Sequence, residues 1–122
     1  MARGVTRRAN LTEELLAAVL EPVRSTEARR ALARAGIGLE LEGFETIARE
    51  LPLLDLPVRI VYGAQDRILP DVGETMERVA RDVPHAEVSV MPDCGHFLQE
   101  EAPDELGSLL AEFFAAGPRM QR

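Results

Sequence analysis

The spacing of apolar residues changes near the middle of the chain, and the first half is predicted to be helical. A first helix starts at Asn10, where Glu13 follows in a capping-box-like arrangement, and it stops before Pro22. A second helix is capped by Ser25, and a third ends at Pro52. The apolar positions that recur at helical spacing are Leu11, Leu15, Leu16, Val19 and Leu20, then Ala28, Leu32 and Ala35, then Phe44, Ile47, Ala48 and Leu51.

From residue 57 the pattern alternates between strands and helices. The segments VRIVY, residues 58–62, and EVSVM, residues 87–91, are short, rich in β-branched residues and bounded by proline and glycine, which is typical of buried strands. A helix capped by Asp71 is predicted between them, and a last helix starts at Pro103 or Asp104. One face of the first of these helices is expected to carry Val72, Met76, Val79, Ala80 and Val83. The last helix is expected to bury Leu106, Leu109, Leu110, Phe113 and Phe114.

This order of elements predicts an α/β fold built on a βαβ unit with two parallel strands. Loops that follow parallel strands emerge at the same edge of the sheet, and neighbouring strands lie about 4.8 Å apart. The loop after the first strand holds Asp66, and the loop after the second holds His96. We therefore expect the Asp66 carboxylate to accept the Nδ1–H of His96, which fixes the tautomer and stabilises the cation formed during proton transfer.

Composition narrows the class of protein and its partners. The chain of 122 residues has the length of one domain, with a boundary expected near residues 51–57 between a helical segment (1–50) and an α/β segment (51–122). The net charge of −7 argues against nucleic acid as a partner. The single cysteine, Cys94, cannot form an internal disulfide, and the sequence predicts neither a signal peptide nor a membrane-spanning segment. We therefore expect a soluble, cytoplasmic protein that does not bind membranes.

Two loop motifs in this order resemble the C-terminal part of the α/β-hydrolase family, including its esterase, epoxide hydrolase, haloalkane dehalogenase and C–C hydrolase branches. The stretch LPVRIVYGAQDRILP is similar to the family's acid loop, G-x-x-D-x-x-x-P, with Gly63, Asp66 and Pro70 at the fixed positions. The stretch EVSVMPDCGHFLQEEAPDELGSLLAEFF is similar to the base loop, G-H-[FY], with His96 after Gly95. Each motif alone is weak, but both in this order, with a helix between them and a helix after, are specific.

The resemblance implies an activity and a role for two side chains. Carried over by position, Asp66 resembles the acid and His96 the general base of a catalytic triad. The resemblance is strong over residues 51–116 and weaker over residues 5–50, which look like the last helices of the family's cap domain. The implied reaction is hydrolysis of small ester-type, epoxide or haloalkane-type substrates or activated C–C bonds, with no cofactor or metal.

The chain departs from the family pattern at the nucleophile. The family places it in a G-x-S-x-G turn, with Asp or Cys instead of Ser in some branches. None of the three serines, Ser25, Ser89 and Ser108, lies in such a turn, and no G-x-D-x-G, G-x-C-x-G or HG oxyanion-hole motif occurs. We expect these parts to be encoded upstream of Met1, and the chain to be incomplete or inactive on its own.

Several residues near the two loops allow other interpretations. His96 could be a loop histidine packed under the last helix, and Asp66 a residue that caps its turn. Cys94 and His96 could form a nucleophile pair, although residues two apart on a loop seldom align for proton transfer. His85 is expected on the surface. A metal site could form from His85, Cys94 and His96 with Asp93. Gln99, Glu100 and Glu101 could be a solvated acidic run, or Glu100 could instead orient the loop. Phe97 and Leu98 could line a pocket or pack in the core.

Three functions remain open on the sequence. The first is a hydrolase portion that gives an acid and a base to a nucleophile elsewhere. The second is a non-catalytic, truncated homologue that acts as an interaction or dimerisation module, because a two-stranded sheet has bare edges that a homodimer or a second polypeptide would cover. The third is a small α/β binding domain, for which the sequence contains no phosphate-binding glycine motif or other ligand motif.

Overall fold

The computed structural model describes residues 4–38 and 42–117, and the chain divides into two compact units. One unit comprises residues 1–10 and 50–122, and the other comprises residues 11–49. The sequence predicts one boundary near residues 51–57, with all of residues 1–50 in the helical segment. In the structure, residues 1–10 instead belong to the same unit as residues 50–122. The first ten residues group with the α/β unit because their backbone is hydrogen-bonded to it, as described below.

The helical unit consists of α1 (Glu13–Leu20), the 3₁₀ helix η2 (Glu21–Val23), α2 (Thr26–Ile37) and most of α3 (Glu42–Glu50). The hydroxyl oxygen of Thr12 accepts a hydrogen bond from the Leu15 amide at 3.1 Å, so Thr12 caps α1 and the predicted cap at Asn10 is wrong. The hydroxyl of Ser25 caps α2, as predicted, by accepting from the Ala28 amide at 3.0 Å. Both caps satisfy an amide that has no partner within its own helix.

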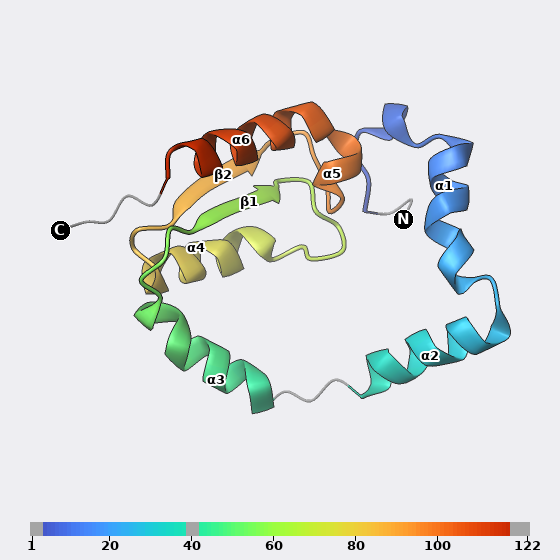
Figure 1. The fold of residues 1–122 in the computed structure, drawn as a ribbon, viewed down its shortest axis with the longest axis horizontal. Coiled ribbons are helices and arrows are strands. Elements are labelled where there is room, and N and C mark those ends of the chain that lie inside the picture. The colour runs from blue at the N-terminus through green and yellow to red at the C-terminus, as the bar shows by residue number, and fades with distance from the viewer. Residues whose placement is uncertain (1–3, 39–41, 118–122) are drawn as a thin grey trace. The chain divides into compact units, whose positions relative to one another are not determined.

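The α/β unit consists of η1 (Arg8–Asn10), η3 (Leu51–Leu53), β1 (Arg59–Gly63), α4 (Val72–Asp82), β2 (Glu87–Met91), α5 (Leu98–Glu101) and α6 (Pro103–Ala115). Strands β1 and β2 pair in parallel, with a register that runs from Arg59 opposite Glu87 to Gly63 opposite Met91. Within this unit, the two strands lie between α4 and α6 (Figure 1). The predicted α/β fold, with two parallel strands joined through a helix, is confirmed, and the short helix α5 is an addition that the sequence did not predict.

A small apolar core lies where β2 meets the helices that follow it. Met91, Cys94 and Ala102 are buried together, and Val61 and Leu98 pack against them. This cluster takes one residue from the end of β2, one from the loop after it and one from the junction between α5 and α6. The core therefore holds the loop after β2 at both of its ends.

The apolar face of α6 is less buried than the sequence predicts. Residues Leu106, Leu109 and Phe113 are half-buried, whereas Leu110 is 39% exposed and Phe114 is 75% exposed. Two strands about 4.8 Å apart offer a surface too narrow for the whole face of a helix. None of the helices in residues 4–38 and 42–117 is long and apolar enough to cross a membrane.

Candidate active site

Two loops leave the carboxyl ends of β1 and β2 and run against each other. We call residues 64–71 the acid loop and residues 92–97 the histidine loop. The Gln65 amide donates a hydrogen bond to the Cys94 carbonyl oxygen at 2.9 Å. A Cβ atom added to Gly63 would collide with the backbone of Cys94, so this close approach requires a glycine. The two loops are therefore fixed to each other through their backbones.

The side chains of Asp66 and His96 meet between these loops. The Oδ2 atom of Asp66 lies 2.8 Å from Nδ1 of His96, and the side chains are 5% and 31% exposed, respectively. The other carboxylate oxygen, Oδ1, accepts hydrogen bonds from the amides of Ile68 and Leu69 at 2.8 and 2.9 Å. These two amides orient the carboxylate so that Oδ2 faces the imidazole. The predicted contact between the two side chains is thus present, and their catalytic roles stay a prediction.

The carboxyl group of Asp66 is held in its ionised form. Burial on its own raises the pKa of Asp66, but hydrogen bonds from the Leu69 amide, the His96 ring and the Ile68 amide outweigh burial and lower that pKa below its ordinary value. An ionised carboxylate only accepts hydrogen bonds, so Nδ1 of His96 carries the proton in this pair. In a neutral imidazole this leaves the lone pair on Nε2, the form that a general base requires.

Glu101 carries a buried carboxylate. The prediction that it belongs to a solvated acidic run is wrong. Its side chain belongs to a residue that is 3% exposed. One oxygen, Oε2, accepts from the amides of Thr6 and Arg7 at 2.7 Å each, and Oε1 accepts from the Gly95 amide at 2.9 Å. Glu101 therefore connects the histidine loop to the N-terminal residues of the chain.

A signal for this burial is present in the sequence in the spacing around α5. Leu98, Glu101 and Ala102 occupy positions i, i+3 and i+4, which lie on one face of a helix. Leu98 and Ala102 belong to the apolar core, so the side chain between them must also point inward. Glu100 lies off this face and makes no side-chain hydrogen bond in the part of the chain that the structure describes.

The other candidate residues do not assemble into a second reactive centre. Cys94 is completely buried, and burial raises the pKa of its thiol, which disfavours the reactive thiolate. His85 is exposed, and its Nε2 lies 2.8 Å from the Leu56 carbonyl oxygen. Asp93 is exposed and pairs with Arg7 at 3.6 Å. Among the described residues, no group of three or more His, Cys, Asp and Glu side chains is arranged to hold a metal ion.

Phe97 and Leu98 follow His96 and differ in their surroundings. Leu98 packs against the buried core, as expected for a core residue. The ring of Phe97 meets the ring of His96 edge to face, with 5.0 Å between their centres. Phe97 also approaches Gly4, where an added Cβ atom would lie 2.9 Å from its Cε2 atom. Phe97 thus packs between the imidazole and the N-terminal residues.

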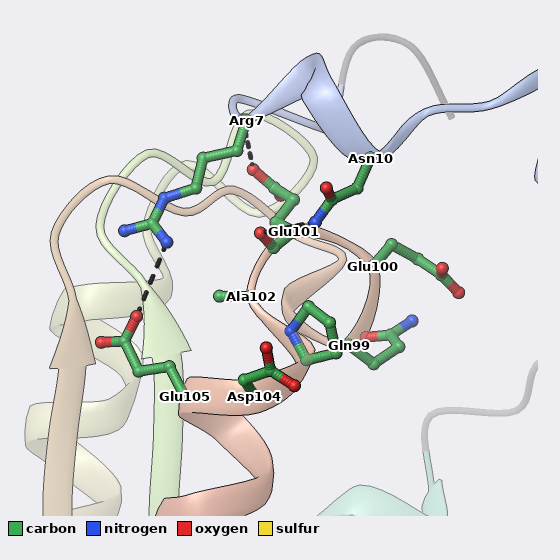
Figure 2. A pocket seen from close by; sticks show the side chains of 9 residues that line it. Arg7, Asn10, Gln99, Glu100, Glu101, Ala102, Asp104 and Glu105 are labelled. Carbon is green, nitrogen blue, oxygen red and sulfur yellow. Dashed lines mark hydrogen bonds and ion pairs between the residues drawn. The ribbon is translucent and has the colours of Figure 1, made fainter.

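A separate cavity of about 650 Å³ is lined in part by Glu101. Figure 2 shows the side chains that line it, which come from the N-terminal residues and from α5 and the start of α6; they are Arg7, Asn10, Gln99, Glu100, Glu101, Ala102, Pro103, Asp104 and Glu105. Arg7 reaches across this cavity to Glu105 at 3.6 Å. Asp66 and His96 do not line the cavity, so it is distinct from the candidate active site.

Comparison with known proteins gives hydrolases among the relatives of this chain. A family model described as the alpha/beta hydrolase family matches residues 2–108. A 2-hydroxy-6-oxononadienedioate/2-hydroxy-6-oxononatrienedioate hydrolase from Pseudomonas sp is 33% identical over a match that covers 86% of this chain and 36% of the relative. A monoacylglycerol lipase, ABHD6 of Bos taurus, is 27% identical over 58% of this chain and 20% of its own length. The chain thus spans about a third or less of these two relatives.

A solved structure supports the same relationship. The enzyme Est816, described as degrading N-acyl homoserine lactones, superposes with a TM-score of 0.61 and 25% sequence identity, over 92% of this chain and 44% of that enzyme. The family match covers most of the chain, and the two loops of the candidate site lie inside it. This chain therefore belongs to the alpha/beta hydrolase family.

Proposed function

We propose that this chain provides the acid and the general base of a hydrolase active site, with Asp66 as the acid and His96 as the base. The observation that carries the proposal is the 2.8 Å contact between Asp66 Oδ2 and His96 Nδ1, made by residues thirty positions apart on the loops after two parallel strands. Family membership supports a hydrolytic reaction. The separation of the two residues in sequence means that the fold, rather than local chain geometry, creates the pair.

The chemistry follows from the protonation of this pair. Nε2 of His96 removes the proton from an attacking hydroxyl group or water, and the Asp66 carboxylate stabilises the imidazolium that forms. Asp66 keeps its charge during this step because its lowered pKa disfavours protonation. The proton is then returned by His96 to the leaving group.

The nucleophile in this proposal comes from a polypeptide segment outside this sequence. The hydroxyl groups of the three serines are hydrogen-bonded elsewhere: Ser25 accepts from Ala28, Ser89 accepts from Arg59, and Ser108 donates to Asp104. The segment would come from a longer form of the protein or from a second chain. In the same proposal, the helical segment is the end of a cap domain, and residues 51–122 are the C-terminal part of the hydrolase domain.

The relatives favour substrates that are attacked at a carbonyl carbon. Their names refer to an oxo-dienedioate, a monoacylglycerol and an N-acyl homoserine lactone, each of which contains such a carbon. We therefore place small ester-type substrates before epoxide-type and haloalkane-type substrates for this chain. The proposed chemistry uses no cofactor.

The test is a fusion in which this chain replaces the matching segment of the Pseudomonas hydrolase. We expect the fusion to hydrolyse p-nitrophenyl butyrate, and His96→Ala to lower kcat at least about a thousandfold. Asp66→Asn should cause a comparable loss by presenting the wrong tautomer. His85→Ala is the matched control, because that histidine is exposed and outside the site, and it should leave kcat unchanged. A folded fusion that is inactive, or one in which His96→Ala retains full turnover, would contradict the proposal.

A second candidate function is an interaction module, supported by the open surface of β2. Val88 and Val90 on this strand are 43% and 47% exposed, and the described part of the sheet contains two strands, each with one unpaired edge. A homodimer or a second polypeptide would cover this surface. Sedimentation of the purified chain should then give about twice the mass of 13.4 kDa, and Val90→Lys should restore the monomer mass. A monomer at micromolar concentration would remove the dimer from consideration.

A further inference from the structure

The residues at the N-terminus of the α/β unit form a strap over the histidine loop. We define the strap as residues 4–10. The His96 amide donates to the Gly4 carbonyl oxygen at 2.6 Å, and Asn10 Nδ2 donates to the Glu101 carbonyl oxygen at 3.3 Å. Between these points, the amides of Thr6 and Arg7 donate to the Glu101 carboxylate at 2.7 Å each. The strap is thus bonded at the residue proposed as the base and at Glu101.

The backbone of the histidine loop is enclosed at Gly95. An added Cβ atom there would collide with the Gly4 carbonyl oxygen and come within 3.0 Å of Glu101 Oε1. On the opposite side, an added Cβ at Gly63 would collide with the Gly95 carbonyl oxygen. The end of β1, the histidine loop and the strap therefore lie in three close layers, and the residue before His96 has little space in which to move.

We propose that Glu101 is a positioning residue for His96, which acts by bonding the histidine loop and the strap to one carboxylate. The proposal rests on the proposed function of His96 as a base. Glu101 does not touch the imidazole in this arrangement; it binds the amide of the residue before it, and the strap that it holds binds the His96 amide. Without this carboxylate, the buried Gly95 amide would have no partner and the strap would lose two bonds.

The three donors require a carboxylate rather than an amide side chain. Both oxygens of Glu101 accept from backbone N–H groups, two at Oε2 and one at Oε1. In Glu101→Gln, one of these oxygens becomes an NH₂ group, which donates and therefore cannot accept from the backbone amide facing it. The volume and shape of the side chain stay nearly the same. Glu100→Gln is the matched control, since it makes the same chemical change one residue earlier on α5.

The experiment measures amide hydrogen exchange by NMR on the full chain. In Glu101→Gln we expect exchange at Gly95, His96, Thr6 and Arg7 to accelerate at least about tenfold, the loss expected for bonds to a charged acceptor. Reference amides far from Glu101 should keep their rates. Suitable references are Val83 and Glu87, which donate to the carbonyl oxygens of Val79 and Val58. Glu100→Gln should leave all of these rates unchanged.

The His96 ring gives a second measurement, which general destabilisation would not alter selectively. The Nδ1–H proton bonded to Asp66 is expected to give a resolved NMR signal in the wild-type chain, and in Glu101→Gln that signal should broaden through faster exchange with water. Glu101→Asp, whose side chain is one methylene shorter, should protect either Gly95 or the strap amides, but not both. This variant decides the outcome if Glu101→Gln does not fold.

Two results would overturn the positioning role. One is unchanged exchange and an unchanged ring signal in folded Glu101→Gln, and the other is equal acceleration at the reference amides, which would mean that Glu101 stabilises the whole unit. Neither measurement requires turnover. Failure of the proposed function, seen as activity in His96→Ala, is therefore distinguishable from failure of the positioning role.

Discussion

The bond between Asp66 and His96 can be weakened by exchanging one carboxylate oxygen for an amide nitrogen. Asp66→Asn keeps Oδ1, which accepts from the amides of Ile68 and Leu69, and replaces Oδ2, which faces His96 Nδ1. The NH₂ group cannot accept the Nδ1–H, so the imidazole must move its proton to Nε2 or lose the bond. The substitution therefore tests the predicted tautomer as well as stability.

The expected loss of stability is modest because part of the pair meets solvent. A hydrogen bond to a charged group contributes about 1.5–3 kcal/mol, and we expect the lower end because the His96 side chain is 31% exposed. Urea denaturation at pH 7 should show the free energy of unfolding reduced by about 1.5 kcal/mol. The control is Asp93→Asn. The Asp93 side chain is 77% exposed and makes a surface ion pair with Arg7, so this substitution should change the free energy of unfolding by less than about 1 kcal/mol.

The difference in the free energy of unfolding between wild type and Asp66→Asn should decrease as the pH falls. The folded-state pKa of Asp66 lies below its ordinary value, so the carboxylate is ionised in both states at pH 7 and its bonds contribute fully. Below about pH 4, the unfolded state takes up a proton first, and wild-type stability falls as the pH falls through the folded pKa. The variant lacks this dependence, so the difference in the free energy of unfolding should shrink as the pH falls below about 4. The reasoning would be refuted if the free energies of unfolding of the two proteins differed equally at pH 3 and pH 7. It would also be refuted by a nitrogen NMR spectrum that places the proton of His96 on Nε2 in the wild type.

Three further tests address the burial of Cys94, the close approach at Gly63 and the cap of α1. Cys94, fully buried and with a raised pKa, should react with Ellman's reagent only in urea, and rapid labelling of the native chain would contradict its burial. Gly63→Ala should lower the free energy of unfolding by more than about 2 kcal/mol because its Cβ meets backbone, whereas Gly107→Ala, in open space on α6, should raise it by up to about 1 kcal/mol. Thr12→Ala should reduce the stability of the chain by about 1 kcal/mol, and Asn10→Ala should leave α1 intact by circular dichroism, since Thr12 is the cap.

The meeting of Asp66 and His96 could be predicted because it depends on strand order and direction. Two parallel strands place the loops that follow them at one edge, and the strands were recognisable from short β-branched runs. The side chains therefore had to emerge close together whatever the details of packing. The orientation of the carboxylate, by contrast, depends on two amides in a turn, which no spacing in the sequence specifies.

The hydrogen bonds between Glu101 and the strap could not be predicted in the same way. A carboxylate next to Glu100 in an acidic run resembles a solvated surface, and burial follows from the core contacts of Leu98 and Ala102 on the same helix face. The strap has no apolar periodicity: Val5 is buried, and the next two residues, Thr6 and Arg7, are held by hydrogen bonds from their backbone amides to Glu101. The burial of the α6 face was overestimated for the opposite reason: periodicity shows which face is apolar but not how much surface is available to cover it.

The order of segments along the chain gives the strap its importance. Residues 11–49 form a compact unit that is inserted between the strap and β1, so the chain leaves the α/β unit at Asn10 and re-enters it at Glu50. The exit point is bonded to Glu101 through Asn10, Thr6 and Arg7, and Glu101 is bonded to the residue before His96. The position of His96 is thus bonded to three separate stretches of the chain: the acid loop, the histidine loop with α5, and the strap.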